Sequence, residues 1–117
     1  MSKPPLEKNI VKKILQWLND MDNCRARHHT ATGPYNQSGE PDIDGVLAGR
    51  ALKVEVKRTM RRAAPPLHEH SKAAYEARGA TPLQAKTLME WHQAGALTGV
   101  VSSLDEMKAA LAPLLES

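Results

Sequence analysis

The sequence predicts a mixed α/β domain in which helices pack on a small sheet. Apolar residues recur at helical spacing near both ends of the chain, and two short alternating segments flank a glycine turn in the middle. The predicted elements follow the order helix, strands, helix, strand, helix. With 117 residues the chain is the size of one domain with one core, so we treat residues 1–117 as a single domain.

A first amphipathic helix is expected over residues 4–21. Pro4 and Pro5 suit a helix start, and lysines alternate with a set of apolar residues at helical spacing. These apolar residues are Leu6, Ile10, Val11, Ile14, Leu15, Leu18 and Met21. Residues 24–30 are a short strand candidate, and residues 31–39 are dense in turn formers and predict a loop.

The stretch GEPDIDGVLAGRALKVEVK, residues 39–57, predicts an antiparallel hairpin that turns at Ala48 and Gly49. Side chains alternate between the faces of a strand, so apolar and charged residues of the second strand separate. The core face would carry Leu52, Val54 and Val56, and the other face Lys53, Glu55 and Lys57.

The predicted turn also fixes the register of the hairpin. Partner residues have numbers that sum to 97, which pairs Ile43 with Val54 and Asp42 with Glu55. A slip of one residue would place Asp42 opposite an apolar side chain, so the hydrophobic pattern itself favours the pairing of the two carboxylates.

The rest of the chain predicts one further strand between two helices. Residues 58–80 are basic and contain Pro65 and Pro66, which suggests a mobile insertion with a turn or two of helix. A helix should begin at Thr81 and Pro82 and end near Gly95. Residues 97–102 are a strand candidate, and the spacing of Ser103 and Glu106 predicts a capping box at the start of a last helix.

Composition narrows the class of protein. The net charge is only +3, but eight basic residues lie between positions 50 and 78, which suits either an anionic partner such as nucleic acid or a solvated face. No apolar run approaches the roughly 20 residues of a membrane span, and the N-terminus lacks the apolar region of a secretory signal. A lone Cys24 agrees with a reducing compartment, so we expect a cytoplasmic protein with no membrane partner.

In the predicted hairpin the carboxylates of Asp42 and Glu55 oppose one another at about 5 Å and repel, so another group must offset that repulsion. Protonation of one carboxyl, neighbouring lysines or a divalent cation such as Mg²⁺ would each serve. From the charge alternation alone, an ordinary hairpin with a solvated outer face and weak surface ion pairs is the simpler explanation. The histidines at 28, 29, 68 and 70 also suggest a zinc site, but no cysteine pair supports one.

The order of these residues resembles a known signature. Pro41-Asp42, a gap of 12 residues and then Glu55-Val56-Lys57 matches the PD-(D/E)xK motif of the restriction-endonuclease-like superfamily. The wider context, HHTATGPYNQSGEPDIDGVLAGRALKVEVKR followed by TPLQAKTLMEWHQAGALTGVVSS, resembles the VRR-NUC family of nucleases in its stand-alone form. The resemblance implies a small mixed sheet whose antiparallel hairpin carries the acidic residues and is flanked by helices, in an αβββαβ-type order.

The resemblance also implies roles for individual residues. Asp42 and Glu55 would coordinate Mg²⁺ or Mn²⁺ together with the main-chain carbonyl of Val56, and Lys57 would position the hydrolytic water. Gln84 would complete the catalytic site, and Glu7 would contact a metal-bound water. Contacts with DNA are expected from a basic and histidine set that lies beside these motifs, namely Lys53, Arg58, Arg61, Arg62 and His29 or its neighbour His28.

The implied activity is that of a metal-dependent deoxyribonuclease, an endonuclease that works as a homodimer on branched DNA such as four-way (Holliday) junctions. The last helix carries enough apolar residues to form a dimer surface, although core packing explains them as well: Leu104, Met107, Leu111, Leu114 and Leu115. Two alternatives stay open. One is a noncatalytic DNA-binding module of the same fold, and the other is an exonuclease or restriction-type nuclease.

Overall fold

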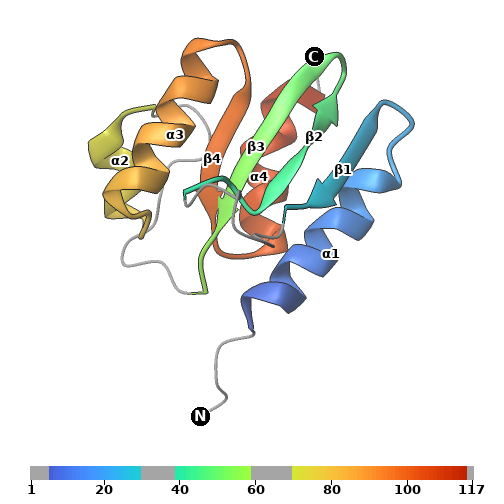
Figure 1. Ribbon diagram of the computed structural model, residues 1–117. Helices are drawn as coiled ribbons and strands as arrows, with labels where there is room; N and C mark the ends of the chain where they lie inside the picture. Colours follow the sequence, from blue (N-terminus) through green and yellow to red (C-terminus); the bar gives the residue numbers. More distant parts are fainter. Residues whose placement is uncertain (1–5, 30–38, 59–69, 116–117) are drawn as a thin grey trace.

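The computed structural model describes residues 6–29, 39–58 and 70–115, which form four helices and four strands (Figure 1). In chain order these are α1 (Glu7–Asn19), β1 (Cys24–His28), β2 (Ile43–Leu47), β3 (Arg50–Val56), α2 (Lys72–Ala77), α3 (Pro82–Gln93), β4 (Leu97–Val101) and α4 (Leu104–Leu115). None of the helices in these ranges is long and apolar enough to span a bilayer. The loop predicted over residues 31–39 falls, except for Gly39, outside the described residues.

The strands form one mixed sheet in the order β1-β2-β3-β4. The first three strands are antiparallel, while β4 runs parallel to β3 after a crossover through α2 and α3 (Figure 1). Ile43 pairs with Val54, which confirms the predicted hairpin register. The turn between β2 and β3 holds Ala48 at φ 51° and Gly49 at φ 84°. Two positive φ values match the turn type that follows the natural twist of a hairpin.

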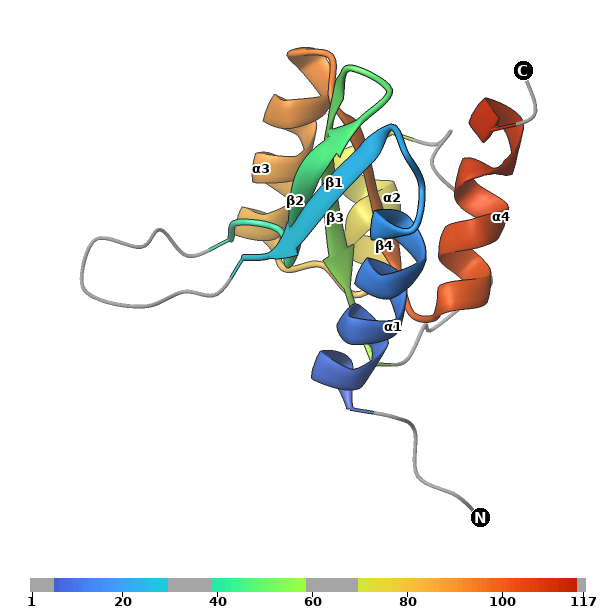
Figure 2. The same cartoon turned by 90° about the vertical axis from the view of Figure 1, so that its right-hand side faces the viewer.

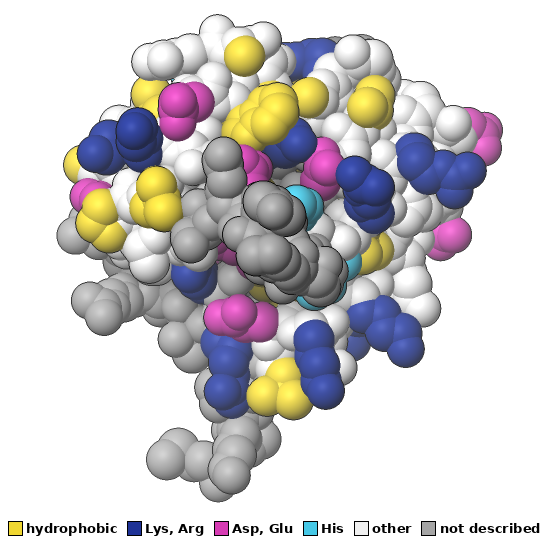
Figure 3. Space-filling model, in the orientation of Figure 1, with side chains coloured by type: hydrophobic (Ala, Val, Ile, Leu, Met, Phe, Trp, Pro, Cys, Tyr) yellow, Lys and Arg dark blue, Asp and Glu magenta, His cyan; other side chains and the backbone are white. Residues whose placement is uncertain are grey.

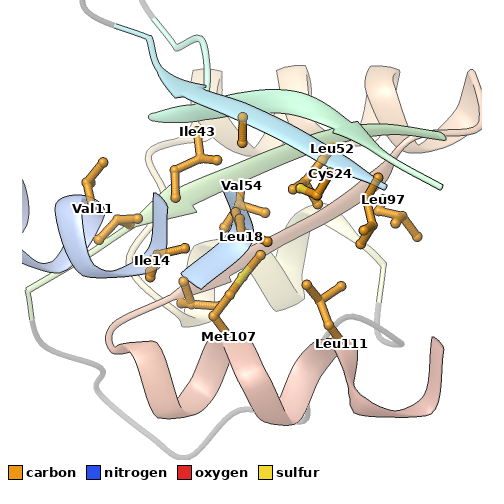
Figure 4. Packing of buried hydrophobic residues seen from close by; sticks show 14 of the residues in the cluster. Val11, Ile14, Leu18, Cys24, Ile43, Leu52, Val54, Leu97, Met107 and Leu111 are labelled. Carbon is orange, nitrogen blue, oxygen red and sulfur yellow. The ribbon is translucent and has the colours of Figure 1, made fainter. Parts of the chain in front are cut away.

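The main core lies between one face of the sheet and helices α1 and α4 (Figure 2). The apolar stripe of α1 supplies Ile10, Val11, Ile14 and Leu18, which confirms the predicted amphipathic helix. The core-facing residues of β3 are fully buried against it, and Met107 and Leu111 of α4 close the cluster (Figure 4). This side of the sheet is an ordinary hydrophobic core.

The opposite face of the sheet is also covered, by α3 with α2 beside it (Figures 1 and 2). A second, smaller cluster fills this layer with Tyr75, Ala80, Ala85, Leu88 and Val100. The sequence pattern left open a solvated row at Lys53 and Glu55, but both side chains are buried here, 9% and 2% exposed. Charges buried under a helix need specific partners, which a solvated face would not require.

The segment predicted as a mobile insertion is partly an integral element of the fold. Helix α2 begins at a Ser71 cap, and its Tyr75 is fully buried, with its hydroxyl hydrogen-bonded to Thr98 of β4 at 2.8 Å. Helix α2 is the short helix predicted within residues 58–80, and through Tyr75 it packs into the domain. Residues 59–69, including Arg61 and Arg62, lie outside the described residues.

Gly45 is required by the close approach of β1 to β2. A Cβ atom at position 45 would lie 2.3 Å from the carbonyl oxygen of Arg25 and 2.6 Å from the Cα of Ala26. Both obstacles are backbone atoms of the neighbouring strand, so no side-chain rotation relieves the overlap. Only a residue without a Cβ allows the two strands to stay in this register.

We expect Gly45→Ala to lower the free energy of unfolding by about 2 kcal/mol or more, because β1 must move away from β2 to admit the methyl group. Urea unfolding followed by circular dichroism measures the change. Val46→Ala is the matched control, because Val46 is exposed on the same strand and its truncation should cost no more than about 0.5 kcal/mol. Equal stability of Gly45→Ala and wild type would contradict the tight approach.

Candidate active site

Asp42 is held by backbone hydrogen bonds at the entry to β2. The amide of His29 donates to the Asp42 carbonyl at 2.7 Å, which extends the pairing of β1 and β2 by one residue. The amide of Val56 donates to Asp42 Oδ2 at 2.9 Å. This second bond joins the Asp42 carboxylate to the end of β3, beside Glu55. The predicted proximity of Asp42 and Glu55 is therefore present, although Asp42 lies just outside the regular ladder.

Glu55 is a buried acid with an unusual electrostatic environment. Burial raises its pKa from 4.5 to about 9, helped by the Asp42 carboxyl, which lies within hydrogen-bonding reach. Lys57 and the Val56 amide oppose the rise in this pKa without cancelling it. Among the residues that the structure describes, the buried atom Glu55 Oε2 has no hydrogen-bond partner. Without a cation, the protonated form of Glu55 is therefore favoured near neutral pH, and this proton relieves the repulsion between the two carboxyls.

Lys57 follows the last residue of β3 and approaches the same acids. Its amide donates to the carbonyl of Val101 at 2.9 Å, which continues the parallel pairing of β3 and β4. Its side-chain stem packs against Gly79, where an added Cβ would lie 3.3 Å from Lys57 Cγ. The ammonium is close enough to lower the pKa of Glu55. Asp42, Glu55 and Lys57 are thus brought together, as the motif predicts.

The donor set at this point fits a small divalent cation. Hard ions such as Mg²⁺ accept one or two carboxylates, a main-chain carbonyl and several waters. The unpartnered Oε2 of Glu55 offers a buried anionic donor once its proton leaves, and a cation would reverse the effect of burial by favouring the ionised form. Within the described ranges, no group of three or more His, Cys, Asp and Glu side chains that could hold a metal ion occurs.

Gln84 and Glu7 have simpler roles in the structure than the resemblance implies. Gln84 Oε1 accepts a hydrogen bond from the Thr81 amide at 2.9 Å, and Thr81 Oγ1 accepts from the Gln84 amide at 3.1 Å. This reciprocal pair is a capping box that begins α3. Glu7 is exposed in the first turn of α1, where its charge suits the helix dipole. Their proposed contacts with the reaction centre stay predictions.

The residues predicted to contact DNA divide into two groups. His29 lies beside Asp42 through their backbone pairing, and Arg58 is exposed directly after Lys57. Lys53 does not fit the role, because its ammonium is buried, bonded to Asp44 at 2.5 Å and placed 3.9 Å from the centroid of the Trp91 ring. Arg61 and Arg62 cannot be placed, since they lie outside the described residues.

Sequence reasoning missed the partners of Lys53. Asp44 directly opposes Lys53 in the β2–β3 ladder, and Trp91 reaches the same ammonium from α3. The signal for Asp44 was present, because it follows Asp42 by two residues and so shares its face of the strand. The signal for Trp91 was weaker, since a tryptophan on a helix is most simply a core residue.

The raised pKa of Glu55 predicts how stability depends on pH without metal. A protonated Glu55 is favoured in the folded state, so its stabilising effect is fully present below pH 4.5 and is lost as the pH rises towards about 9. We expect the melting temperature in EDTA to fall from pH 5 to pH 9. Glu55→Gln, which mimics the protonated acid, should flatten that dependence, and identical slopes for both proteins would contradict a protonated Glu55.

No protein-family model matches this chain, and no curated protein is detectably similar to it in sequence. A solved structure described as a VRR_NUC domain is similar over 94% of each chain, with a TM-score of 0.59 and 22% sequence identity. This likeness confirms the predicted fold. The chain therefore has a mixed α/β fold like that of a VRR_NUC domain.

Proposed function

We propose that this chain is a metal-dependent DNA endonuclease that hydrolyses phosphodiester bonds. The observation that carries the proposal is the meeting of Asp42, the buried Glu55 and the ammonium of Lys57 at one end of the β2–β3 hairpin. The likeness to a VRR_NUC domain supports a nuclease-type role, because this chain carries its PD-(D/E)xK residues on a fold of that kind.

Each residue of the site has a distinct task in this proposal. Asp42, Glu55 and the main-chain carbonyl of Val56 would hold Mg²⁺ or Mn²⁺. Such an ion polarises a phosphate oxygen and stabilises the negative charge that develops during hydrolysis. Lys57, half-buried and fixed by its stem, would orient the attacking water and offset the charge of the carboxylates. The Val56 amide keeps the Asp42 carboxylate turned towards Glu55.

Basic side chains are spread over the surface of the described residues. On the face seen in Figure 3, Lys and Arg side chains are interspersed with acidic and histidine side chains. A separate open groove of about 690 Å³ lies along α1 and is lined in part by Lys8, Lys12 and His28. We propose that His29, His28 and Arg58 contact backbone phosphates, with Arg61 and Arg62 continuing the basic surface, so that binding weakens steeply with salt.

We further propose a homodimer that acts on branched DNA such as four-way junctions and leaves a 5′-phosphate. Two-fold symmetry would bring two active sites to a substrate with two strands to cut. In the last helix, Met107 and Leu111 are buried in the core, whereas Leu114 and Leu115 are each 42% exposed. These two leucines are the part of α4 that would serve a dimer surface.

Cleavage of labelled four-way junction, flap, linear duplex and single-stranded DNA in Mg²⁺ or Mn²⁺ tests the proposal. We expect Asp42→Ala and Lys57→Met to lose about 10²–10⁴-fold in cleavage rate while retaining DNA binding, because the first removes a proposed metal ligand and the second the group that would orient the attacking water. Glu90→Gln on α3 is the control for a charge change on an exposed residue with no proposed role in the site. Wild type that binds DNA but cuts none of these substrates would favour the noncatalytic DNA-binding module.

A further inference from the structure

The buried Lys53 and the partly exposed Asp44 form an ion pair one step along the sheet from the proposed metal ligands. Lys53 Nζ bonds Asp44 Oδ1 at 2.5 Å, and the two residues are direct cross-strand partners. The same ammonium lies 3.9 Å from the centroid of Trp91 on α3. The other Asp44 oxygen faces Arg27 of β1 at 3.6 Å, although the Arg27 side chain is 79% exposed and that pair is weak.

Besides Asp44, two other acids, Asp42 and Glu55, lie near Lys53. Asp42 precedes Asp44 by two residues, so it is the diagonal neighbour of Lys53, at ~7–8 Å between backbone positions and within reach of a lysine side chain. Glu55 lies two residues along the strand from Lys53, on the same face. An ammonium free to move across this face would compete with a cation for Asp42 and Glu55.

We propose that Asp44 is a positioning residue that captures the Lys53 ammonium and so leaves Asp42 and Glu55 available to a divalent cation. Three features hold Lys53 in place: the charged hydrogen bond to Asp44, the face of the Trp91 ring and burial under α3. Because the Lys53 ammonium is buried, water screens its contacts with Asp44 and Trp91 less than it would at the surface, although the Asp44 side chain is still 24% exposed. This inference rests on the proposed function of the Asp42 and Glu55 pair as cation ligands.

Trp91 provides a direct readout of where Lys53 lies. The chain has two tryptophans, so a Trp17→Phe background leaves Trp91 as the single indole reporter. In that background Asp44→Asn removes the charge that fixes the ammonium, and Trp91 emission should change as Lys53 leaves the ring. Lys53→Met removes the ammonium while keeping an apolar stem, so it should produce a change of the same direction. Unchanged emission in Asp44→Asn would overturn the proposal.

Binding of Mn²⁺ alone, measured by calorimetry without DNA, tests the consequence for the metal site. We expect Asp44→Asn to weaken Mn²⁺ binding about tenfold in the Trp17→Phe background, within the range of coupling between contacting residues. The same substitution on top of Lys53→Met should change affinity by less than about twofold, because no ammonium is left to compete. Asp44→Glu, which keeps a carboxylate opposite Lys53, should restore most of the affinity.

Comparing the Asp44 and Lys53 single variants with the double variant distinguishes the holding of the Lys53 ammonium by Asp44 from a simple effect of the Asp44 charge on the metal. If Asp44→Asn weakens Mn²⁺ binding equally with and without Lys53, Asp44 acts only through its own charge and the proposal is overturned. If the parent protein binds no Mn²⁺, the proposed function fails, which is a different result from equal weakening. Asp44→Ser and Lys53→Leu repeat the cycle should either first variant fail to fold.

Discussion

The pairing register of β2 and β3 brings Asp42 beside Glu55, and the geometry of the site depends on it. The register is set on the apolar face, where Ile43 opposes Val54 and both are fully buried. A slip of one residue would expose these side chains and place charges in the main core, at a cost of several kcal/mol. The carboxylates meet because the hydrophobic residues behind them leave no other arrangement.

The second helical layer makes this hairpin different from an ordinary one. Helix α3 covers the charged face of β3, so Lys53 and Glu55 lose their water and each must find a protein partner, a proton or a cation. Lys53 finds Asp44 and the Trp91 ring, whereas Glu55 keeps an oxygen with no partner among the described residues. The two buried ionisable groups of β3 therefore differ, because Lys53 has its partners within the protein and Glu55 has an oxygen available to a ligand.

Much of this fold could be predicted from the sequence, because its signals are local. The periodicity of α1, the alternation along β3 and the Thr81-Pro82 helix start each reflect nearest-neighbour geometry. The burial of Lys53 and Glu55 could not be predicted, since a charged row looks the same in sequence whether water or a helix covers it. The packing of Tyr75 was missed for a similar reason, because its partner Thr98 lies 23 residues away.

The unpartnered oxygen of Glu55 is also the strongest physical argument that the site serves more than structure. A buried carboxyl without a full set of hydrogen bonds lowers stability, and an apolar side chain of similar size at position 55 would pack under α3 without that penalty. Elsewhere in the described residues, α2 and α3 begin with side-chain caps and the main core is closely packed. A local departure from the rules of a stable fold is typical of a position occupied for its chemistry. Lys57 lies close to Glu55, and the Val56 amide holds the Asp42 carboxylate beside it. The buried carboxyl without a full set of hydrogen bonds is therefore one of the motif residues.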